Sequence, residues 1–166
     1  ITNNPNLIAS TNQIDELSKK IVTVIPTKNE QEGISALFAF NPDNDIETNS
    51  KLMEESYLSI SSGFVAISSR NVKLNGVDIK KNNYFGILDK IVHKTGKNKL
   101  EVLNSLIKNN IEEEKFITIF SKDKLNSTET EKIESLLNNY EIEIIYGGQS
   151  LQEFLISAEW MEKKWK

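Results

Sequence analysis

The sequence predicts an α/β fold: a parallel or mixed sheet with flanking helices and an antiparallel hairpin insertion. In the last third of the chain, apolar strands at residues 116–120 and 142–146 flank a helical stretch at residues 126–139. A strand, a helix and a second strand in this order favour a crossover between parallel strands. In the middle, residues 72–79 alternate apolar and polar side chains around an Asn-Gly pair, which is a strong hairpin signal.

The first sixty residues are expected to alternate between helix and strand. Pro5 suits the first turn of a helix, because the N–H that proline lacks has no intrahelical partner there. Residues 21–25 form an apolar, β-branched run that predicts a buried strand ended by Pro26. Further helices are expected at residues 30–40 and 45–58. Helical spacing predicts that the first helix buries the side that carries Leu7, Ile8, Ile14 and Leu17.

The middle of the chain completes this pattern. Short apolar runs predict strands at residues 64–67, 84–88 and 91–92. A helix is expected at residues 99–111, and residues 154–157 suggest a last strand. The helix is predicted to turn inward the side that carries Leu100, Leu103, Leu106 and Ile107.

Composition limits the classes of function. The chain has 166 residues and a formal net charge of -4, so it has no general attraction for nucleic acid or anionic lipid. No apolar run approaches the roughly 20 residues that span a bilayer, and membrane insertion is not expected. The absence of cysteine excludes disulfides, thiolate metal sites and cysteine nucleophiles. These features predict a soluble protein of a reducing compartment, and a cytoplasmic location is expected.

Two polar segments that follow predicted strands are the candidate binding site. Thr27 and Lys28 come after the first strand and precede a helix, where the partial positive charge of the helix start could hold an anionic group. Gly147, Gly148 and Gln149 follow the last parallel strand and could cradle a phosphate or carboxylate. If all three strands share a direction, these residues meet at one edge of the sheet. The alternatives are that Thr27 caps a helix beside a solvated Lys28, and that the glycines form an ordinary tight turn.

Three other features have simpler interpretations. His93, the single histidine, is expected in an exposed turn and not in a catalytic site. The run of glutamates at residues 112–114 is interpreted as a solvated helix end and not as a metal site. The tail at residues 160–166 is expected to form a short helix over the end of the sheet, with a docking element as the alternative. No catalytic, metal-binding or cofactor-binding residue is predicted.

Six segments, in their order along the chain, resemble one family. They are VIPTK (24–28), GISALFAF (33–40), FNPDNDIETN (40–49), NGVDIKK (75–81), FGILD (85–89) and YGGQSLQEFLISAE (146–159). The chain resembles the C-terminal domain of the fatty acid kinase A-subunit family, whose members are often labelled Dak phosphatase or DhaL-like proteins. The resemblance extends from the first residue to about Glu159.

The resemblance implies a DegV-like domain at residues 1–159 followed by a tail at residues 160–166. It also implies that the chain is an N-terminally incomplete fragment of a longer protein, whose kinase domain would use ATP and magnesium. The implied partner is a fatty-acid-binding protein of the DegV-like family, and the full-length protein could form a homodimer. The fragment itself is expected to lack catalytic activity, whereas the full-length protein is expected to be one component of a phosphotransferase.

Three functional hypotheses follow. The leading one is a non-catalytic, partner-binding domain that docks the acyl-carrying protein so that another domain can phosphorylate the acyl carboxylate. The second is a DegV-like domain that itself binds a fatty acid or another small molecule, for which Thr27, Ser35 and Ser150 offer hydroxyl groups. The third, a free-standing hydrolase, lacks a recognisable nucleophile or metal cluster in the sequence.

Overall fold

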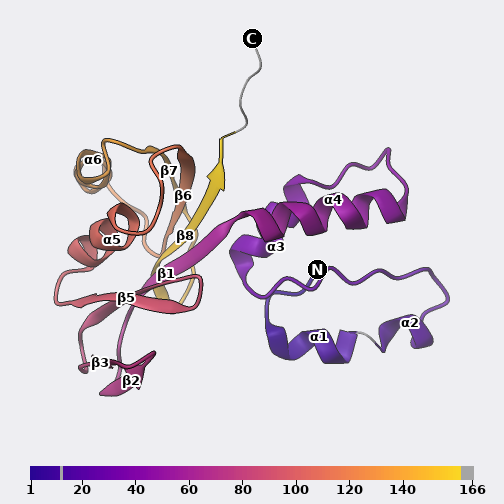
Figure 1. Cartoon of the computed structure of the whole chain (residues 1–166), viewed down its shortest axis with the longest axis horizontal. Coiled ribbons are helices and arrows are strands. Elements are labelled where there is room, and N and C mark those ends of the chain that lie inside the picture. Colours follow the sequence, from indigo (N-terminus) through magenta and orange to yellow (C-terminus); the bar gives the residue numbers. More distant parts are fainter. Residues whose placement is uncertain (12, 162–166) are drawn as a thin grey trace, which may run out of the picture. The chain divides into compact units, whose positions relative to one another are not determined.

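The computed structural model describes residues 1–11 and 13–161. The chain divides into two compact units, Ile1–Ile60 and Ser61–Lys166, and each has its own cluster of buried apolar side chains. Figure 1 labels most elements of both units.

The first unit is helical. Its elements are α1 (Pro5–Thr11), α2 (Ile14–Leu17), α3 (Glu30–Phe38) and α4 (Ile46–Ser59). Helix α3 begins at Asn29, whose side chain accepts a hydrogen bond from the Glu32 N–H at 2.8 Å. Helix α4 begins in the same way at Asp45. The core of this unit is small, and its buried apolar members are Ile25, Ala36, Met53 and Tyr57.

Two predictions for the first unit are wrong. Residues 21–25 do not form a strand, because a strand needs a hydrogen-bonded neighbour and no other described segment pairs with them. The predicted first helix is divided into α1 and α2, and its apolar side remains exposed at Leu7, Ile14 and Leu17. Spacing along the chain identified the apolar side but not what would cover it.

The second unit contains a six-stranded mixed sheet. Its strands are β1 (Ser61–Ile67), β4 (Tyr84–Leu88), β5 (Ile91–Gly96), β6 (Lys115–Ser121), β7 (Glu141–Tyr146) and β8 (Gln152–Trp160). Their order across the sheet is β5-β4-β1-β8-β6-β7. Strands β6 and β7 are parallel, and all other neighbours in this sheet are antiparallel. The predicted α/β class with a mixed sheet is confirmed.

Helices α5 (Lys99–Lys108) and α6 (Ser127–Leu136) belong to this unit, and α6 connects β6 to β7 as predicted (Figure 1). Helix α6 starts with a capping box, in which the Asn126 side chain accepts from the Glu129 N–H and Glu129 accepts from the Asn126 N–H. Both helices pack against the sheet. The fully buried core residues include Val65, Val102, Leu106, Ile107, Ile117, Ile119, Ile133 and Ile156.

The predicted hairpin is confirmed as a separate two-stranded sheet of β2 (Val72–Leu74) and β3 (Val77–Ile79). Its turn residues Asn75 and Gly76 have φ angles of 47° and 81°, the left-handed conformation that an Asn-Gly hairpin turn requires.

A short helix was predicted for the tail at residues 160–166. This prediction is wrong for Trp160, which is the last residue of β8. Residues 162–166 lie outside the described part of the chain. None of the helices described is both long and apolar enough to cross a membrane.

Candidate functional site

The loop that follows β7 lies at the end of the sheet where β6 also ends and β8 begins. Its first two residues are glycines whose N–H groups point back to β6. The Gly147 N–H donates to the Ser121 carbonyl at 2.8 Å, and the Gly148 N–H donates to the same oxygen at 3.4 Å. These donors are therefore already used within the chain and do not form an open cradle for a phosphate group.

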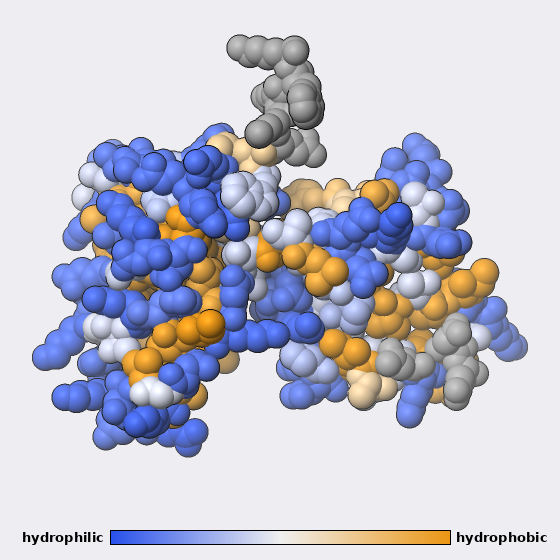
Figure 2. Space-filling view, in the orientation of Figure 1, coloured by the Kyte–Doolittle hydropathy of each residue, from blue (hydrophilic) through white to orange (hydrophobic). Residues whose placement is uncertain are grey.

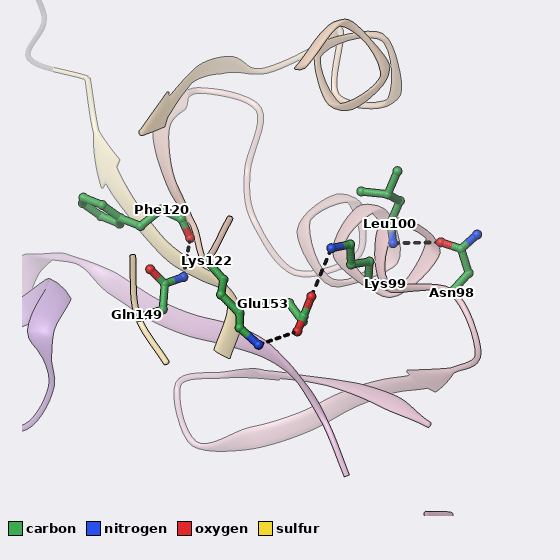
Figure 3. Close-up of polar contacts among 7 residues, drawn as sticks. All are labelled: Asn98, Lys99, Leu100, Phe120, Lys122, Gln149 and Glu153. Carbon is green, nitrogen blue, oxygen red and sulfur yellow. Dashed lines mark hydrogen bonds and ion pairs between the residues drawn. The ribbon is translucent and has the colours of Figure 1, made fainter. Parts of the chain in front are cut away.

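Gln149 anchors the loop. Its side-chain Nε2 donates to the Phe120 carbonyl at 2.8 Å, as Figure 3 shows. A Cβ atom at Gly147 would overlap Gln149 Oε1 and lie 3.0 Å from the Phe120 Cβ, so only glycine leaves room for this arrangement. Gln149 Oε1 is buried and has no hydrogen-bond partner among the residues described. The loop is thus held by three hydrogen bonds to the end of β6.

Two large side chains at the ends of this loop are exposed to solvent. Tyr146 is 62% exposed and Leu151 is 74% exposed. The Tyr146 side chain lies against Gly148, where an added Cβ would be 3.3 Å from the hydroxyl oxygen. An aromatic and an aliphatic side chain on an anchored loop can make contacts with a partner at a small cost in conformational entropy.

A cluster of three charged residues lies beside the loop (Figure 3). The Glu153 carboxylate contacts Lys99 Nζ at 3.0 Å and Lys122 Nζ at 3.4 Å. The Glu153 side chain is 11% exposed, whereas each lysine side chain is 34% exposed. Burial raises the pKa of the Glu153 carboxyl, but the hydrogen bond and charge of Lys99, together with Lys122, outweigh burial and hold the pKa below its ordinary value.

The start of α5 positions one of these lysines. The Asn98 side chain accepts hydrogen bonds from the Leu100 N–H at 2.9 Å and the Glu101 N–H at 3.4 Å, so the helix begins next to Lys99. Lys99 Nζ also lies 5.6 Å from the centre of the Phe154 ring. The cluster therefore joins α5, the end of β6 and the start of β8.

The other half of the predicted site lies in the first unit. Thr27 is completely buried, and its hydroxyl donates to the Thr2 carbonyl while Thr2 Oγ1 donates to the Thr27 carbonyl at 2.6 Å. The Lys28 N–H donates to the Glu32 carboxylate at 2.7 Å. Asn29, and not Thr27, caps α3. The N–H groups of Lys28 and Glu32 at this helix start are therefore engaged within the chain, and the Lys28 side chain is exposed.

The five predicted site residues thus fall into two groups. Thr27 and Lys28 belong to the first unit, and Gly147, Gly148 and Gln149 belong to the second. The sequence predicted that three parallel strands would bring these five residues to one edge of the sheet. This prediction is wrong for the first of the three strands, because residues 21–25 are not a strand of the sheet. What the structure brings together is the loop after β7 and the Glu153 cluster.

Sequence reasoning missed Lys99, Lys122, Glu153, Tyr146 and Leu151 as site residues. The three charged residues are more than twenty positions apart in sequence, and only the sheet order places them together. A usable signal existed for the loop, since the apolar Leu151 follows a Gly-Gly turn in a stretch that is otherwise polar.

The remaining candidates have structural roles. His93 is exposed as predicted, but it lies on β5 and not in a turn. Glu112 pairs with Lys115 at 3.4 Å, and Glu113 accepts a hydrogen bond from Asn139 at 3.1 Å. In the described ranges, no three histidine or acidic side chains are grouped as metal ligands would be.

The first unit also contains a cavity of about 350 Å³. It is lined by Ile1, Thr23, Ile25, Phe40, Asn44, Ile46, Asn49, Ser50 and Met53. Its polar groups are largely engaged within the chain: the Asn49 side chain donates to the Asn41 and Asn44 carbonyls, and the Ser50 hydroxyl donates to the Ile46 carbonyl.

Known proteins align with most of this chain. Protein YloV of Bacillus subtilis is 35% identical over 164 residues, which cover 96% of this chain and 30% of YloV. The uncharacterized protein SH1689 of Staphylococcus haemolyticus is 29% identical over 164 residues, with the same coverage. The chain therefore spans about 30% of the length of these relatives.

A solved structure supports the fold. The crystal structure of the fatty acid binding DegV family protein SAG1342 from Streptococcus agalactiae matches with a TM-score of 0.51 at 12% identity. The match covers 95% of this chain and 65% of that one. The family model for the C-terminal region of fatty acid kinase A-subunits and similar proteins, FakA-like, matches residues 1–159. The chain belongs to this FakA-like C-terminal family.

Proposed function

We propose that the chain is the partner-binding domain of a fatty acid kinase, in which it docks a DegV-like fatty-acid-binding protein. The observation that carries this proposal is the anchored loop after β7, which presents Tyr146 and Leu151 to solvent. Exposed aromatic side chains on a rigid backbone are typical anchors of protein interfaces. We name residues 146–151 the docking loop.

The chemistry around the docking loop favours recognition over catalysis. The N–H groups of Gly147 and Gly148 are used by Ser121, and Glu153 neutralises part of the charge of Lys99 and Lys122. A site for nucleotide phosphates needs free N–H donors or uncompensated positive charge. The docking loop supplies apolar contact area instead.

In this proposal the chain contributes to phosphoryl transfer by positioning. Phosphoryl transfer depends mainly on the placement of donor and acceptor and on electrostatic stabilisation. The chain would hold the acyl-carrying protein so that the acyl carboxylate faces an ATP and magnesium site on another domain of the longer protein. The role of the fold would then be to keep the docking loop rigid.

A second candidate function is direct binding of a fatty acid, and the 350 Å³ cavity of the first unit is the observation that favours it. Its volume falls in the range of small-molecule sites, which is roughly 300–1,000 Å³. The internal hydrogen bonds of Asn49 and Ser50 leave those two side chains poorly suited to hold a carboxylate. Fatty acid detected by native mass spectrometry of the purified chain would support this second function over docking.

The docking proposal is tested by measuring affinity for a DegV-like fatty-acid-binding protein with the double variant Tyr146→Ala/Leu151→Asp. Loss of two interface anchors should weaken binding by at least about tenfold. The matched control is Ile91→Asp, at a similarly exposed apolar position on the opposite edge strand β5. Unchanged affinity of the double variant, with melting temperatures equal to wild type, would contradict the docking loop.

A further inference from the structure

Residues 21–25 have the composition of a strand but no strand partner. The segment reads Ile-Val-Thr-Val-Ile, and β-branched residues favour extended, paired backbone. The Ile25 carbonyl accepts hydrogen bonds from the N–H groups of Thr2 and Thr27. Within the described part of the chain, the backbone groups of Val22, Thr23 and Val24 have no hydrogen-bond partner. An apolar segment with free backbone groups is a template for pairing with another strand.

Other apolar side chains of the first unit are also uncovered. Ile21 is 82% exposed, Leu17 is 85% exposed and Phe38, the last residue of α3, is 87% exposed. Figure 2 shows apolar side chains at the surface of this unit among hydrophilic ones. A unit of sixty residues whose described part buries few apolar side chains is marginal by itself, and large exposed apolar areas mark contact surfaces.

Two comparisons indicate what covers this surface. The chain spans about 30% of the length of its relatives, so such proteins contain a long additional polypeptide. The fold match covers 95% of this chain but 65% of the DegV family chain, so that fold extends beyond what this chain contains. We propose that residues 21–25 form a β-strand in the full-length protein by pairing with a strand from the remainder of the same polypeptide.

The alternation of side chains defines how this strand would be oriented. Thr23 and Ile25 both line the cavity of the first unit, and Ile25 is part of its core. Because successive side chains of a strand point to opposite faces, Val22 and Val24 face away from that cavity. The pairing strand would supply its own backbone donors and acceptors, and its apolar side chains would continue the layer to which Val22 and Val24 belong.

The test is hydrogen–deuterium exchange at the amides of residues 22–24 in two proteins, the full-length polypeptide and the 166-residue chain. Pairing with one strand should slow exchange roughly a hundredfold in the full-length protein relative to the shorter chain, either at Thr23 or at Val22 and Val24. Successive N–H groups of a strand point to opposite sides, and paired amides exchange only when the structure opens. This protection should not depend on protein concentration. The measurement needs no substitution, so it does not depend on a variant folding.

A substitution gives an independent readout. Val24→Asp should lower the melting temperature of the full-length protein by more than that of the 166-residue chain, in which Val24 is half-buried, since the carboxylate would be fully buried only where the strand is paired. Ile91→Asp, at an exposed position on β5, is the matched control. Fast exchange at residues 22–24 in the full-length protein would overturn the proposal. Protection that appears in the 166-residue chain only as it dimerises would also overturn it, because the partner would then be a second copy.

Discussion

Glu153 Oε2 lies 3.0 Å from Lys99 Nζ, and this contact joins the start of β8 to the first turn of α5 (Figure 3). Glu153 Oε1 extends the link to Lys122, which follows β6. The Lys122 N–H also donates to the Glu153 carbonyl at 3.0 Å. One carboxylate therefore connects three elements next to the docking loop. Its removal should lower the stability of the protein and the order of this loop.

Glu153→Gln is expected to lower the free energy of unfolding by about 1–2 kcal/mol at pH 7, between the values for exposed and buried ion pairs. The folded-state pKa of Glu153 lies below its ordinary value of 4.5. The pair therefore stabilises the protein above about pH 4.5, and this contribution disappears as the pH falls through the folded-state pKa. In urea unfolding, the difference between the unfolding free energies of wild type and variant should be largest at pH 7 and should shrink as the pH is lowered toward 3.

The control for this prediction is Glu143→Gln, which removes an exposed carboxylate from edge strand β7. Its unfolding free energy should match wild type at both pH values. A loss in Glu153→Gln that has the same size at pH 3 as at pH 7 would mean that the contact between Glu153 and the two lysines is not the cause.

Gly147→Ala is expected to destabilise the second unit by about 1–2 kcal/mol, because the new methyl group displaces the Gln149 side chain from its bond to Phe120. Gln149→Ala should cost about 1 kcal/mol by losing the same hydrogen bond. The double variant should cost less than the sum of the two, because it removes the overlap. Additive losses in urea unfolding would contradict this coupling.

Asn98→Ala is expected to cost about 1 kcal/mol, because the N–H groups of Leu100 and Glu101 lose their shared acceptor. Asn98→Asp retains the acceptor and adds a negative charge at a helix start, so its stability should equal or exceed that of wild type. Thermal unfolding of the three proteins tests this order. Equal losses in both variants would show that the cap does not stabilise α5.

Gly63→Ala is expected to destabilise β1 by more than about 2 kcal/mol, because the added Cβ would overlap the Ile87 carbonyl and lie 3.1 Å from the Leu88 Cα. These are backbone atoms of the neighbouring strand and cannot rotate away. Gly33→Ala is the contrasting change, since its nearest neighbour would be the Ile1 Cγ2 at 3.5 Å. Because Gly33 lies within helix α3 and alanine favours helix more than glycine does, Gly33→Ala should be neutral or should stabilise the protein by up to about 1 kcal/mol.

These two variants are compared by urea unfolding and by hydrogen exchange at the amides of β4, which pairs with β1. Gly63→Ala should accelerate exchange in β4 even if the variant remains folded. Similar stabilities of Gly63→Ala and Gly33→Ala would indicate that the close approach of β1 and β4 relaxes without cost.

Local signals in the sequence determined much of the second unit. The Asn75-Gly76 hairpin, the capped helix at Ser127–Leu136 and the parallel pair β6 and β7 were all predictable, because each depends on neighbours in sequence. Turn conformation, helix capping and side-chain periodicity act over a few residues, so a single sequence contains their evidence. The mixed α/β class followed from these elements and from the hairpin.

Sequence also identified the Gly-Gly-Gln turn, but only the tertiary structure decided its role. The sheet order brings the Ser121 and Phe120 carbonyls within reach of that turn and places Glu153 between Lys99 and Lys122. Hydrogen bonds and ion pairs between distant residues depend on which strands become neighbours, and that choice is made by burial of the whole apolar core.

Residues 21–25 are a second case in which the sequence alone could not predict the structure. Their composition was sufficient to predict an extended, apolar segment, but a strand exists only when a second segment supplies hydrogen bonds. Side-chain preference is a property of the sequence, whereas strand pairing is a property of the fold. The sequence determined what this segment favours, and the tertiary structure decided that the backbone groups of Val22, Thr23 and Val24 have no partner among the residues described.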